Sequence, residues 1–175
     1  MDRLRWRGAR APLSNVIGGL GNGWRVAMTT LGEGAGEITT QYPGYRAEFD
    51  RLVARLRDLG RLADPLVCDE LARLLIRVEL MHFTGRRVAD ELRAGNPVRE
   101  LLAIDKVNWS ELHCDLGAAA MSLQGLGGLV RPGCDGYRVD EFQRAFLESR
   151  GRGIARGTNQ IQCNIIAERV LGLPK

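Results

Sequence analysis

The sequence predicts an all-α protein, an up-and-down bundle of helices. Apolar residues recur at steps of three and four over long stretches, which is the spacing of one face of a helix. No segment alternates apolar and polar residues with a period of two over the length of a strand. Clusters of glycine and proline separate the periodic stretches and mark the places where helices end.

The glycine-rich residues 1–22 are expected to be irregular, and the bundle is expected to span residues 23–175. A first helix should start near Trp24, because apolar residues follow it at helical spacing as far as Leu31. Three glycines then occur within five residues, and each costs a helix about 0.8–1.0 kcal/mol relative to alanine. This turn should therefore be frayed or distorted.

The second and third helices are separated by clear stop signals. Tyr42-Pro43-Gly44 predicts a break, so the second helix is expected over residues 47–59. Asp64-Pro65 should open the third and longest helix, since proline suits a first turn, and the helix should run to about Leu92. Its predicted core face is Val67, Leu71, Leu74, Leu75, Val78 and Met81.

The second half of the chain predicts three more helices. They are expected over residues 99–123, 139–147 and 159–171, with a loop over residues 125–136. Small residues dominate one stripe of the first of these helices and would allow close contact with a neighbouring helix. That stripe is Ala103, Val107, Ser110, Cys114, Ala118 and Met121.

Composition indicates an ordinary globular chain. It has 175 residues, of which 45% are hydrophobic and 26% charged, enough for one good core. The net charge of +4 comes from arginine, because Lys106 and Lys175 are the only lysines. Acidic residues are scattered among the arginines and no nucleic-acid-binding motif accompanies them, so we expect solvated helix faces and no nucleic-acid partner.

The four cysteines lie far apart and form no Cys-x-x-Cys pair, so neither a metal site nor a disulfide framework is expected. The basic first fifteen residues lack the apolar core of a signal peptide, and no apolar stretch approaches the roughly 18 residues of a membrane span. We therefore expect a cytoplasmic chain without membrane contact.

The last twenty residues, RGTNQIQCNIIAERVLGLPK, carry the strongest signal. Gly157-Thr158 form a turn, Thr158 or Asn159 can cap the helix that follows, and Gly172 and Pro174 end it. The sequence of this segment closely resembles the C-terminal signature of bacterial acyl-CoA dehydrogenases. Four further segments resemble the family in the same order: Pro12–Met28, Thr29–Gly36, Leu123–Gly128 and Leu147–Ile154. The chain is thus similar to the family's C-terminal helical domain, and segments resembling its N-terminal helical domain and β-domain are absent from this sequence.

The resemblance implies FAD-dependent α,β-desaturation of an acyl-CoA thioester. In the family one carboxylate removes the α-proton while a hydride leaves to the flavin, and such a base needs a pKa near the working pH. The base comes either from the position of Arg156, whose guanidinium stays protonated, or from the first helix, where Glu33 is the candidate and Glu37 the rival. Glu33 can also be read as an exposed residue of a weak turn.

The resemblance also implies contacts to substrate and cofactor. Gly34 stands where the family commonly has an arginine, and Arg156 beside Gly157 can either supply that charge to the substrate or plug the acyl pocket. The expected FAD-binding residues are Thr158, Gln160, Ser122, Gly125, Gly128 and Arg61. From the residues alone, Thr158 is equally a helix cap and Gly125 and Gly128 a turn, while His82 and His113 are packed or surface residues.

Two functional classes follow from the resemblance. The chain is the flavin-proximal part of an acyl-CoA dehydrogenase, or it is a non-catalytic partner subunit or remnant that serves as an oligomerisation module. In either case we expect a homo- or hetero-oligomer with acyl-CoA dehydrogenase-like chains. Alone, the chain is expected to hold FAD weakly and to have little dehydrogenase activity.

Overall fold

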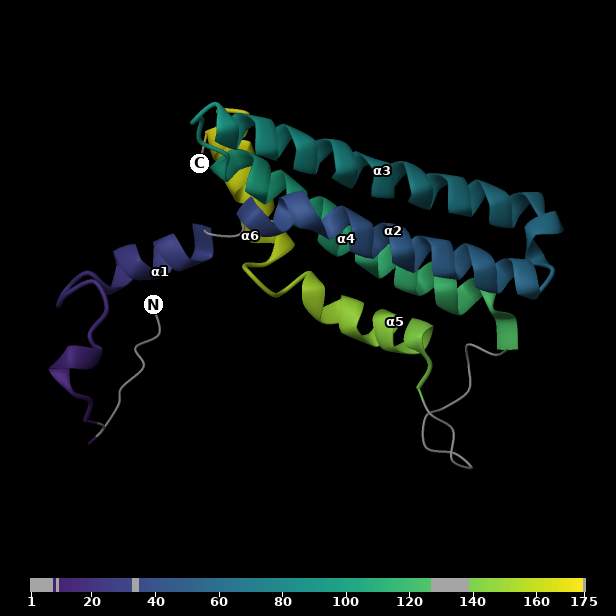
Figure 1. Ribbon diagram of the computed structural model, residues 1–175, viewed down its shortest axis with the longest axis horizontal. Coiled ribbons are helices and arrows are strands. Elements are labelled where there is room, and N and C mark those ends of the chain that lie inside the picture. Colours follow the sequence, from purple (N-terminus) through teal and green to yellow (C-terminus); the bar gives the residue numbers. More distant parts are fainter. Residues whose placement is uncertain (1–7, 9, 33–34, 127–138, 175) are drawn as a thin grey trace. The chain divides into compact units, whose positions relative to one another are not determined.

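The computed structural model describes residues 8, 10–32, 35–126 and 139–174. The chain divides into two compact units, Met1–Glu33 and Gly34–Lys175. The first unit contains a 3-10 turn, η1 (Leu13–Asn15), and helix α1 (Gly23–Gly32). The second unit contains α2 (Ala35–Asp58), η2 (Arg61–Ala63), α3 (Pro65–Arg93), α4 (Arg99–Leu123), α5 (Glu141–Arg152), α6 (Asn159–Ile165) and the π-helical turn η4 (Ile166–Val170) (Figure 1). Every regular element of the described ranges is helical, which confirms the predicted all-α class.

Helix α4 is the centre of the second unit, because it packs against α2, α3, α5 and α6. The long helices α2, α3 and α4 are joined by short connections, and each runs antiparallel to the one before it (Figure 1). The core that they share with α5 is Phe49, Leu52, Leu56, Val67, Leu71, Leu74, Val78, Met81, Trp109, Leu112, Leu116, Ala119, Ala120 and Phe142. Gly117 brings α4 and α5 close together, since a Cβ there would lie 2.8 Å from Phe146 Cα.

Helix α3 follows its prediction closely. The Asp64 side chain accepts a hydrogen bond from Leu66 N at 2.9 Å and caps the helix, with Pro65 in the first turn. Five of the six residues of the predicted core face are buried, and Leu75 is half-buried. The bounds of α4 are also as predicted.

The predicted break at Pro43 is wrong, because α2 continues through it. Proline in a helix interior costs about 3 kcal/mol, but Pro43 lies on the exposed side of the helix. Tyr42 and Tyr45 pack inward against the core, and Phe49 is buried one turn later. Burial of each large side chain contributes roughly 1.5–3 kcal/mol, so packing on both sides of Pro43 outweighs the lost hydrogen bond.

The small-residue stripe predicted on α4 is wrong in part: Ala103 and Ser110 are buried, but Ala118 is exposed. A helix surrounded by four others is buried over a wide arc rather than along one narrow stripe.

Two other predicted bounds differ from the structure. Helix α5 begins with an Asp140–Gln143 capping box and runs five residues beyond the predicted end, to Arg152. The last helix is α-helical only to Ile165 and then widens into η4. Apart from residues 125 and 126, the predicted loop 125–136 lies outside the described residues. The expected domain boundary after residue 22 stays a prediction.

Candidate functional site

The turn that leads into α6 has an unusual backbone. Arg156 has φ 60° and Gly157 has φ 88°, so two successive residues are left-handed. This conformation costs a non-glycine residue about 1–2 kcal/mol. At Gly157 a side chain would also meet Gln162 Nε2, 3.1 Å from the added Cβ. Gln162 Nε2 donates to Arg156 O at 3.2 Å, and this bond closes the turn and fixes the exposed arginine on it.

Of the two predicted caps, Thr158 and Asn159, Thr158 is the N-cap of α6. Its hydroxyl oxygen accepts a hydrogen bond from Ile161 N at 3.4 Å, and its backbone is extended. The next two side chains differ: Asn159 is half-buried and Gln160 is exposed. Within the described part of the chain, the Gln160 side chain makes no hydrogen bond, so its amide faces solvent at the start of α6.

Asn159 ties the turn to the centre of the bundle. Its Oδ1 accepts hydrogen bonds from Lys106 Nζ at 2.6 Å and from Ser110 Oγ at 2.9 Å, both on α4. Lys106 Nζ also donates to Gly153 O at 3.1 Å, at the end of α5. Lys106 is only 5% exposed, and burial lowers the pKa of its ammonium group. A buried cation therefore holds α4, the end of α5 and the start of α6 together.

Asp105, the residue before Lys106, is also buried, but in the described part of the chain its side chain lacks hydrogen bonds of the kind that Lys106 makes. It is 2% exposed, and neither carboxylate oxygen has a hydrogen-bond partner among the described residues. Burial raises the pKa of the Asp105 carboxyl to about 7. The group is therefore close to half-protonated at neutral pH, which makes it a titratable point next to the α6 anchor.

Tyr45 connects α2 to this region. Burial raises the pKa of the Tyr45 hydroxyl to about 12, against the opposing charge of Arg152. The charge of Asp105 raises this pKa further, and the charge of Arg156 lowers it. About two turns after Asp105 along α4, His113 Nε2 lies 3.5 Å from the Glu48 carboxylate.

The two predicted histidines are packed residues. His113 is buried and stacks edge-on against Tyr45, with ring centroids 5.7 Å apart. His82 lies between the rings of Tyr42 and Phe83, at 4.4 Å and 5.6 Å. Within the described ranges, no group of His, Cys, Asp and Glu side chains could hold a metal ion. None of the described helices combines the length and hydrophobicity needed to span a membrane.

The structure brings together only some of the sequence-predicted site residues. Arg156, Gly157, Thr158 and Gln160 form one group at the start of α6. Glu33, Gly34 and Gly128 lie outside the described residues, and the same holds for the side chain of Glu37. The proton acceptor predicted at Glu33 therefore stays a prediction.

Arg61, Ser122 and Gly125 form a second group at the far end of the bundle. Ser122 lies in the last turn of α4 and Gly125 just after it, and Arg61 opens η2 between α2 and α3. Since α2 and α4 run in the same direction, their C-terminal ends lie together (Figure 1). The twelve positions from Ser110 to Ser122 correspond to about 18 Å of helix. The two groups of expected FAD contacts are thus separated by about half the length of α4.

Sequence reasoning missed the buried anchor. Lys106 lies three positions after Ala103 and four before Ser110, both of which were predicted to be buried. A charged residue on the buried face of a helix needs a partner. This position of Lys106 was the signal in the sequence that could have pointed to the anchor. The partner could not be read from the sequence, because Asn159 is 53 positions away.

Fold and site define a helical domain that fixes a polar turn at one end of a bundle by a buried lysine. The family model for "Acyl-CoA dehydrogenase, C-terminal domain" matches residues 21–171. Acyl-CoA dehydrogenase IpdE1 of Mycolicibacterium smegmatis is 37% identical over 168 residues, which cover 95% of this chain and 41% of the relative. IpdE1 of Mycobacterium tuberculosis is also 37% identical, with 95% and 42% covered.

A solved structure, the Tcur3481-Tcur3483 steroid ACAD, has the same fold with a TM-score of 0.83 at 22% identity, covering 97% of this chain and 44% of that one. The chain belongs to the acyl-CoA dehydrogenase family and corresponds to its C-terminal helical domain. It spans less than half the length of these relatives.

Proposed function

We propose that this chain is the C-terminal domain of an FAD-dependent acyl-CoA dehydrogenase, which desaturates an acyl-CoA thioester between its α and β carbons. Family membership supports the reaction class. The observation that carries the proposal for this chain is the α6 turn, Arg156–Gln160, held by Lys106 and Asn159. A turn fixed by a buried hydrogen-bonded cation is pre-organised, as a cofactor contact requires.

The residues at the start of α6 fit a flavin cofactor. Gln160 is exposed and Thr158 half-buried, so both can reach a neighbouring group, and both are polar. Amide and hydroxyl groups suit the hydroxyl and phosphate oxygens of FAD. When bound, FAD supplies the hydride acceptor of the reaction. Thr158 and Gln160 would orient it and would take no part in proton transfer.

We propose that the working protein contains at least two such chains, identical or related. Arg61 and Ser122 lie about 18 Å or more from the α6 turn along the bundle. We infer that one flavin site uses the two groups from different chains. This supports the expected homo- or hetero-oligomer, with acyl-CoA thioester as the substrate.

Glu33 is our proposed proton acceptor. Arg156 occupies the other base position of the family, and its guanidinium cannot accept a proton at neutral pH. Arg156 is exposed on a closed turn, where it can contact an anionic part of the substrate.

The test uses this chain completed with the N-terminal and β-domains of a family relative. The parent should contain FAD and reduce it on addition of acyl-CoA. Glu33→Gln removes basicity at constant size, so flavin reduction should fall by about 10² to 10⁴ with FAD content unchanged. Glu37→Gln is the matched control and should reduce flavin at the parental rate. If only the control loses activity, the base is Glu37.

A non-catalytic partner subunit is the second candidate, and the arginine at position 156 favours it. In that case both glutamine variants would keep the parental rate, and the base would belong to the companion chain. The uncompleted chain alone should turn over no acyl-CoA with an artificial electron acceptor. Turnover by this chain alone would contradict both candidates.

A further inference from the structure

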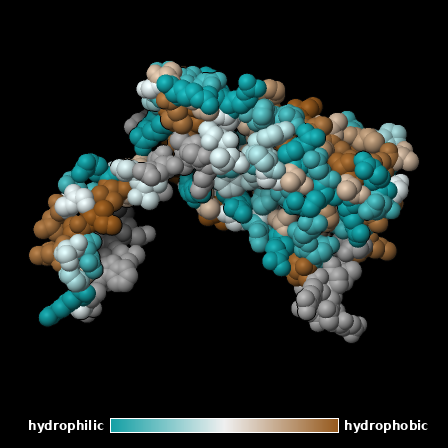
Figure 2. Space-filling model, in the orientation of Figure 1, coloured by the Kyte–Doolittle hydropathy of each residue, from teal (hydrophilic) through white to brown (hydrophobic). Residues whose placement is uncertain are grey.

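Four buried side-chain atoms of the described residues have no hydrogen-bond partner: Gln41 Oε1, both carboxylate oxygens of Asp105, and His113 Nδ1. Buried polar atoms in folded proteins are nearly always hydrogen-bonded, so each exception needs an explanation. Hydrophilic groups gather on the surface where Figure 1 places α2 and α5 (Figure 2), whereas these four atoms are enclosed. All four belong to α2 and α4, which pack against each other.

The four atoms lie along the interface between α2 and α4. Gln41 is four residues before Tyr45 and seven before Glu48, so these three side chains share one face of α2. Asp105 is eight residues before His113, about two turns, and shares a face of α4 with it. The two faces meet at His113, which lies 3.5 Å from the Glu48 carboxylate and packs edge-on against Tyr45.

Among the described residues, this interface presents acceptors that no donor satisfies. An amide oxygen and an ionised carboxylate can only accept hydrogen bonds. Asp105 is 2% exposed, and burial raises the pKa of its carboxyl to about 7. A proton on Asp105 turns one of its oxygens into a donor, and Gln41 Oε1 on the facing helix can accept the bond. Protonation therefore satisfies both side chains at once.

Other ionisable groups also face α4 or Tyr45. Arginines stay charged at neutral pH, and the Tyr45 hydroxyl, whose pKa burial raises to about 12, stays neutral. Histidines and glutamates in general change charge at mildly acidic pH, so a variant of Asp105 must leave His113 and Glu48 unchanged. The groups that the neighbouring helices and turns contribute are Tyr45, Glu48, Arg77, Arg152, Arg156 and Cys163.

The first two turns of α2, residues 35–41, are attached through a small apolar cluster of their own. Ile38 is buried there and packs with Val88 and Val98, apart from the main core. Pro43 separates these turns from the rest of α2. Because proline lacks the N–H that would bond four residues back, the helix is easiest to bend at this point.

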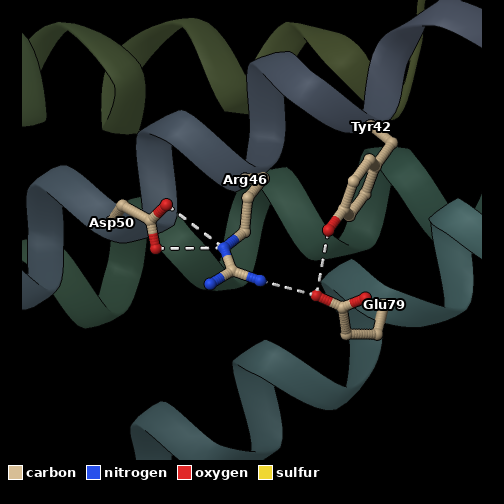
Figure 3. Close-up of polar contacts among 4 residues, drawn as sticks. All are labelled: Tyr42, Arg46, Asp50 and Glu79. Atoms are coloured by element: carbon tan, nitrogen blue, oxygen red, sulfur yellow. Dashed lines mark hydrogen bonds and ion pairs between the residues drawn. The ribbon is translucent and has the colours of Figure 1, made fainter.

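Towards α3, the polar groups of α2 are satisfied around this hinge. Glu79 accepts hydrogen bonds from Tyr42 at 3.1 Å and from Arg46 at 2.8 Å (Figure 3). Arg46 also pairs with Asp50 at 3.0 Å. These bonds hold α2 from Tyr42 onwards, so the turns before Tyr42 depend on Ile38 and on the interface with α4.

We propose that residues 35–41 form an arm whose docking on α4 depends on a proton at Asp105, with a hydrogen bond from Asp105 to Gln41 Oε1 and a hinge at Pro43. A charged carboxylate cannot donate this bond and gains hydration when the arm opens. The pKa of Asp105 is about 7 with the arm docked and returns towards 3.8 when the carboxyl is hydrated. Opening therefore becomes easier as pH rises from about 4 to 7 and changes little above that range.

The arm begins two residues after Glu33, the proposed proton acceptor. Opening would therefore lower the fraction of chains in which the base is held in place. This consequence for catalysis rests on the proposed function, whereas the docking itself does not. Docking can be measured in the purified chain without cofactor or substrate.

Hydrogen exchange of the backbone amides of residues 39–42 reports opening, because two detached turns of helix are too short to be stable alone. Asp105→Asn keeps a donor for Gln41 but has no proton to lose, so its arm should stay docked. The exchange rate of the parent relative to Asp105→Asn should rise about tenfold from pH 5 to pH 6. The matched control is Asp58→Asn, at the exposed end of α2, which should exchange at the parental rate.

Low concentrations of urea separate opening of the arm from unfolding of the bundle. Opening exposes little surface, so exchange of the arm should not respond to urea, whereas core amides of α3 should exchange faster. Infrared spectra at pH 6, where exposed carboxyls are ionised, report the proton itself. The parent and Asp58→Asn should show the carbonyl band of a protonated carboxylic acid, and Asp105→Asn should lack it.

A parent without this band would overturn the proton at Asp105. An exchange ratio that stays constant over the same pH range would overturn the proton-dependent docking, and an arm as sensitive to urea as the core would overturn the hinge. Circular dichroism checks folding, and Asp105→Ser, which also keeps a donor, replaces Asp105→Asn if that variant is unfolded. Flavin reduction by Glu33→Gln is a separate measurement, so the proposed base and the arm can fail independently.

Discussion

The two ends of the second unit are built in different ways. At the α6 end, Lys106 bonds to Asn159 across 53 positions of sequence, and Arg150 donates to Cys114 O across 36. At the far end, Ser122 Oγ donates to Ala119 O and Gln124 Nε2 to Ala120 O, only three and four positions back. Non-local contacts, with the buried Lys106 among them, make the α6 end sensitive to substitution, whereas the far end depends on its own helix turn.

Asp105→Asn should give the largest change in stability. Below pH 3.8, the ordinary pKa of an aspartate, the Asp105 carboxyl is protonated in both the folded and the unfolded chain. Above about pH 7 it is charged in both, and in the folded chain this charge is buried without a partner among the described residues. Between these values the unfolded chain has lost the proton and the folded chain keeps it, so stability falls as pH rises. At about 1.4 kcal/mol per pKa unit the loss is about 4 kcal/mol at most. The neutral asparagine should remove this decline.

Urea unfolding at several pH values between 4 and 8 checks this prediction. Asp58→Asn, on the exposed last residue of α2, is the control and should keep the parental profile. A profile of Asp105→Asn that runs parallel to the parent would show that the buried carboxyl finds a partner in solution.

The two partners of the Lys106–Asn159 hydrogen bond should differ in how much stability is lost when each is replaced. Asn159→Leu leaves the buried Lys106 ammonium without its carboxamide partner, and Lys106→Met removes the charge along with the bond. An unsatisfied buried group costs about 1–3 kcal/mol, and more when it is charged. We therefore expect Asn159→Leu to lower the free energy of unfolding more than Lys106→Met does. Equal losses in urea unfolding at pH 7 would mean that the lysine escapes to solvent when its partner is removed.

Arg156→Gly should have a small effect on stability. Glycine removes the left-handed strain of about 1–2 kcal/mol but adds backbone freedom of about 0.5–1 kcal/mol, so the net change should be a stabilisation of about 1 kcal/mol. In the completed protein the same variant separates two roles of the arginine. A higher KM for acyl-CoA indicates that Arg156 binds the substrate, and a lower one indicates that it blocks the pocket.

Much of the fold could be predicted from periodicity and caps. Asp64-Pro65 and the core face of α3 gave its bounds to within one residue, and Thr158 was rightly expected to cap α6. The predicted break at Pro43 was wrong because tertiary packing outweighed the tendency of proline to end a helix. Tyr42 and Tyr45 pack inward, while Pro43 is exposed. A proline is a reliable sign of a helix end only where the residues before and after it do not both pack into the core.

The candidate site was harder to predict. Thr158 and Gln160 were predicted because the terminal segment resembles a known signature, but Asp105 and Tyr45 carry no motif. Their environment depends on which helices pack against α4, and that follows from the three-dimensional arrangement. The proposed separation of Arg61 and Ser122 from the α6 turn likewise became visible only in the fold.

The central claim is that one flavin site takes residues from the α6 end of one chain and the far end of another. Subunit complementation in the completed protein tests it directly. Thr158→Ala with Gln160→Ala, and separately Arg61→Ala, should each lower FAD content. Co-expressed, the two variants form mixed dimers in which one site carries both lesions and the other carries none, so about a quarter of all sites should regain parental FAD. An FAD content equal to the average of the two variants would show that each site is built within a single chain, and would contradict the account.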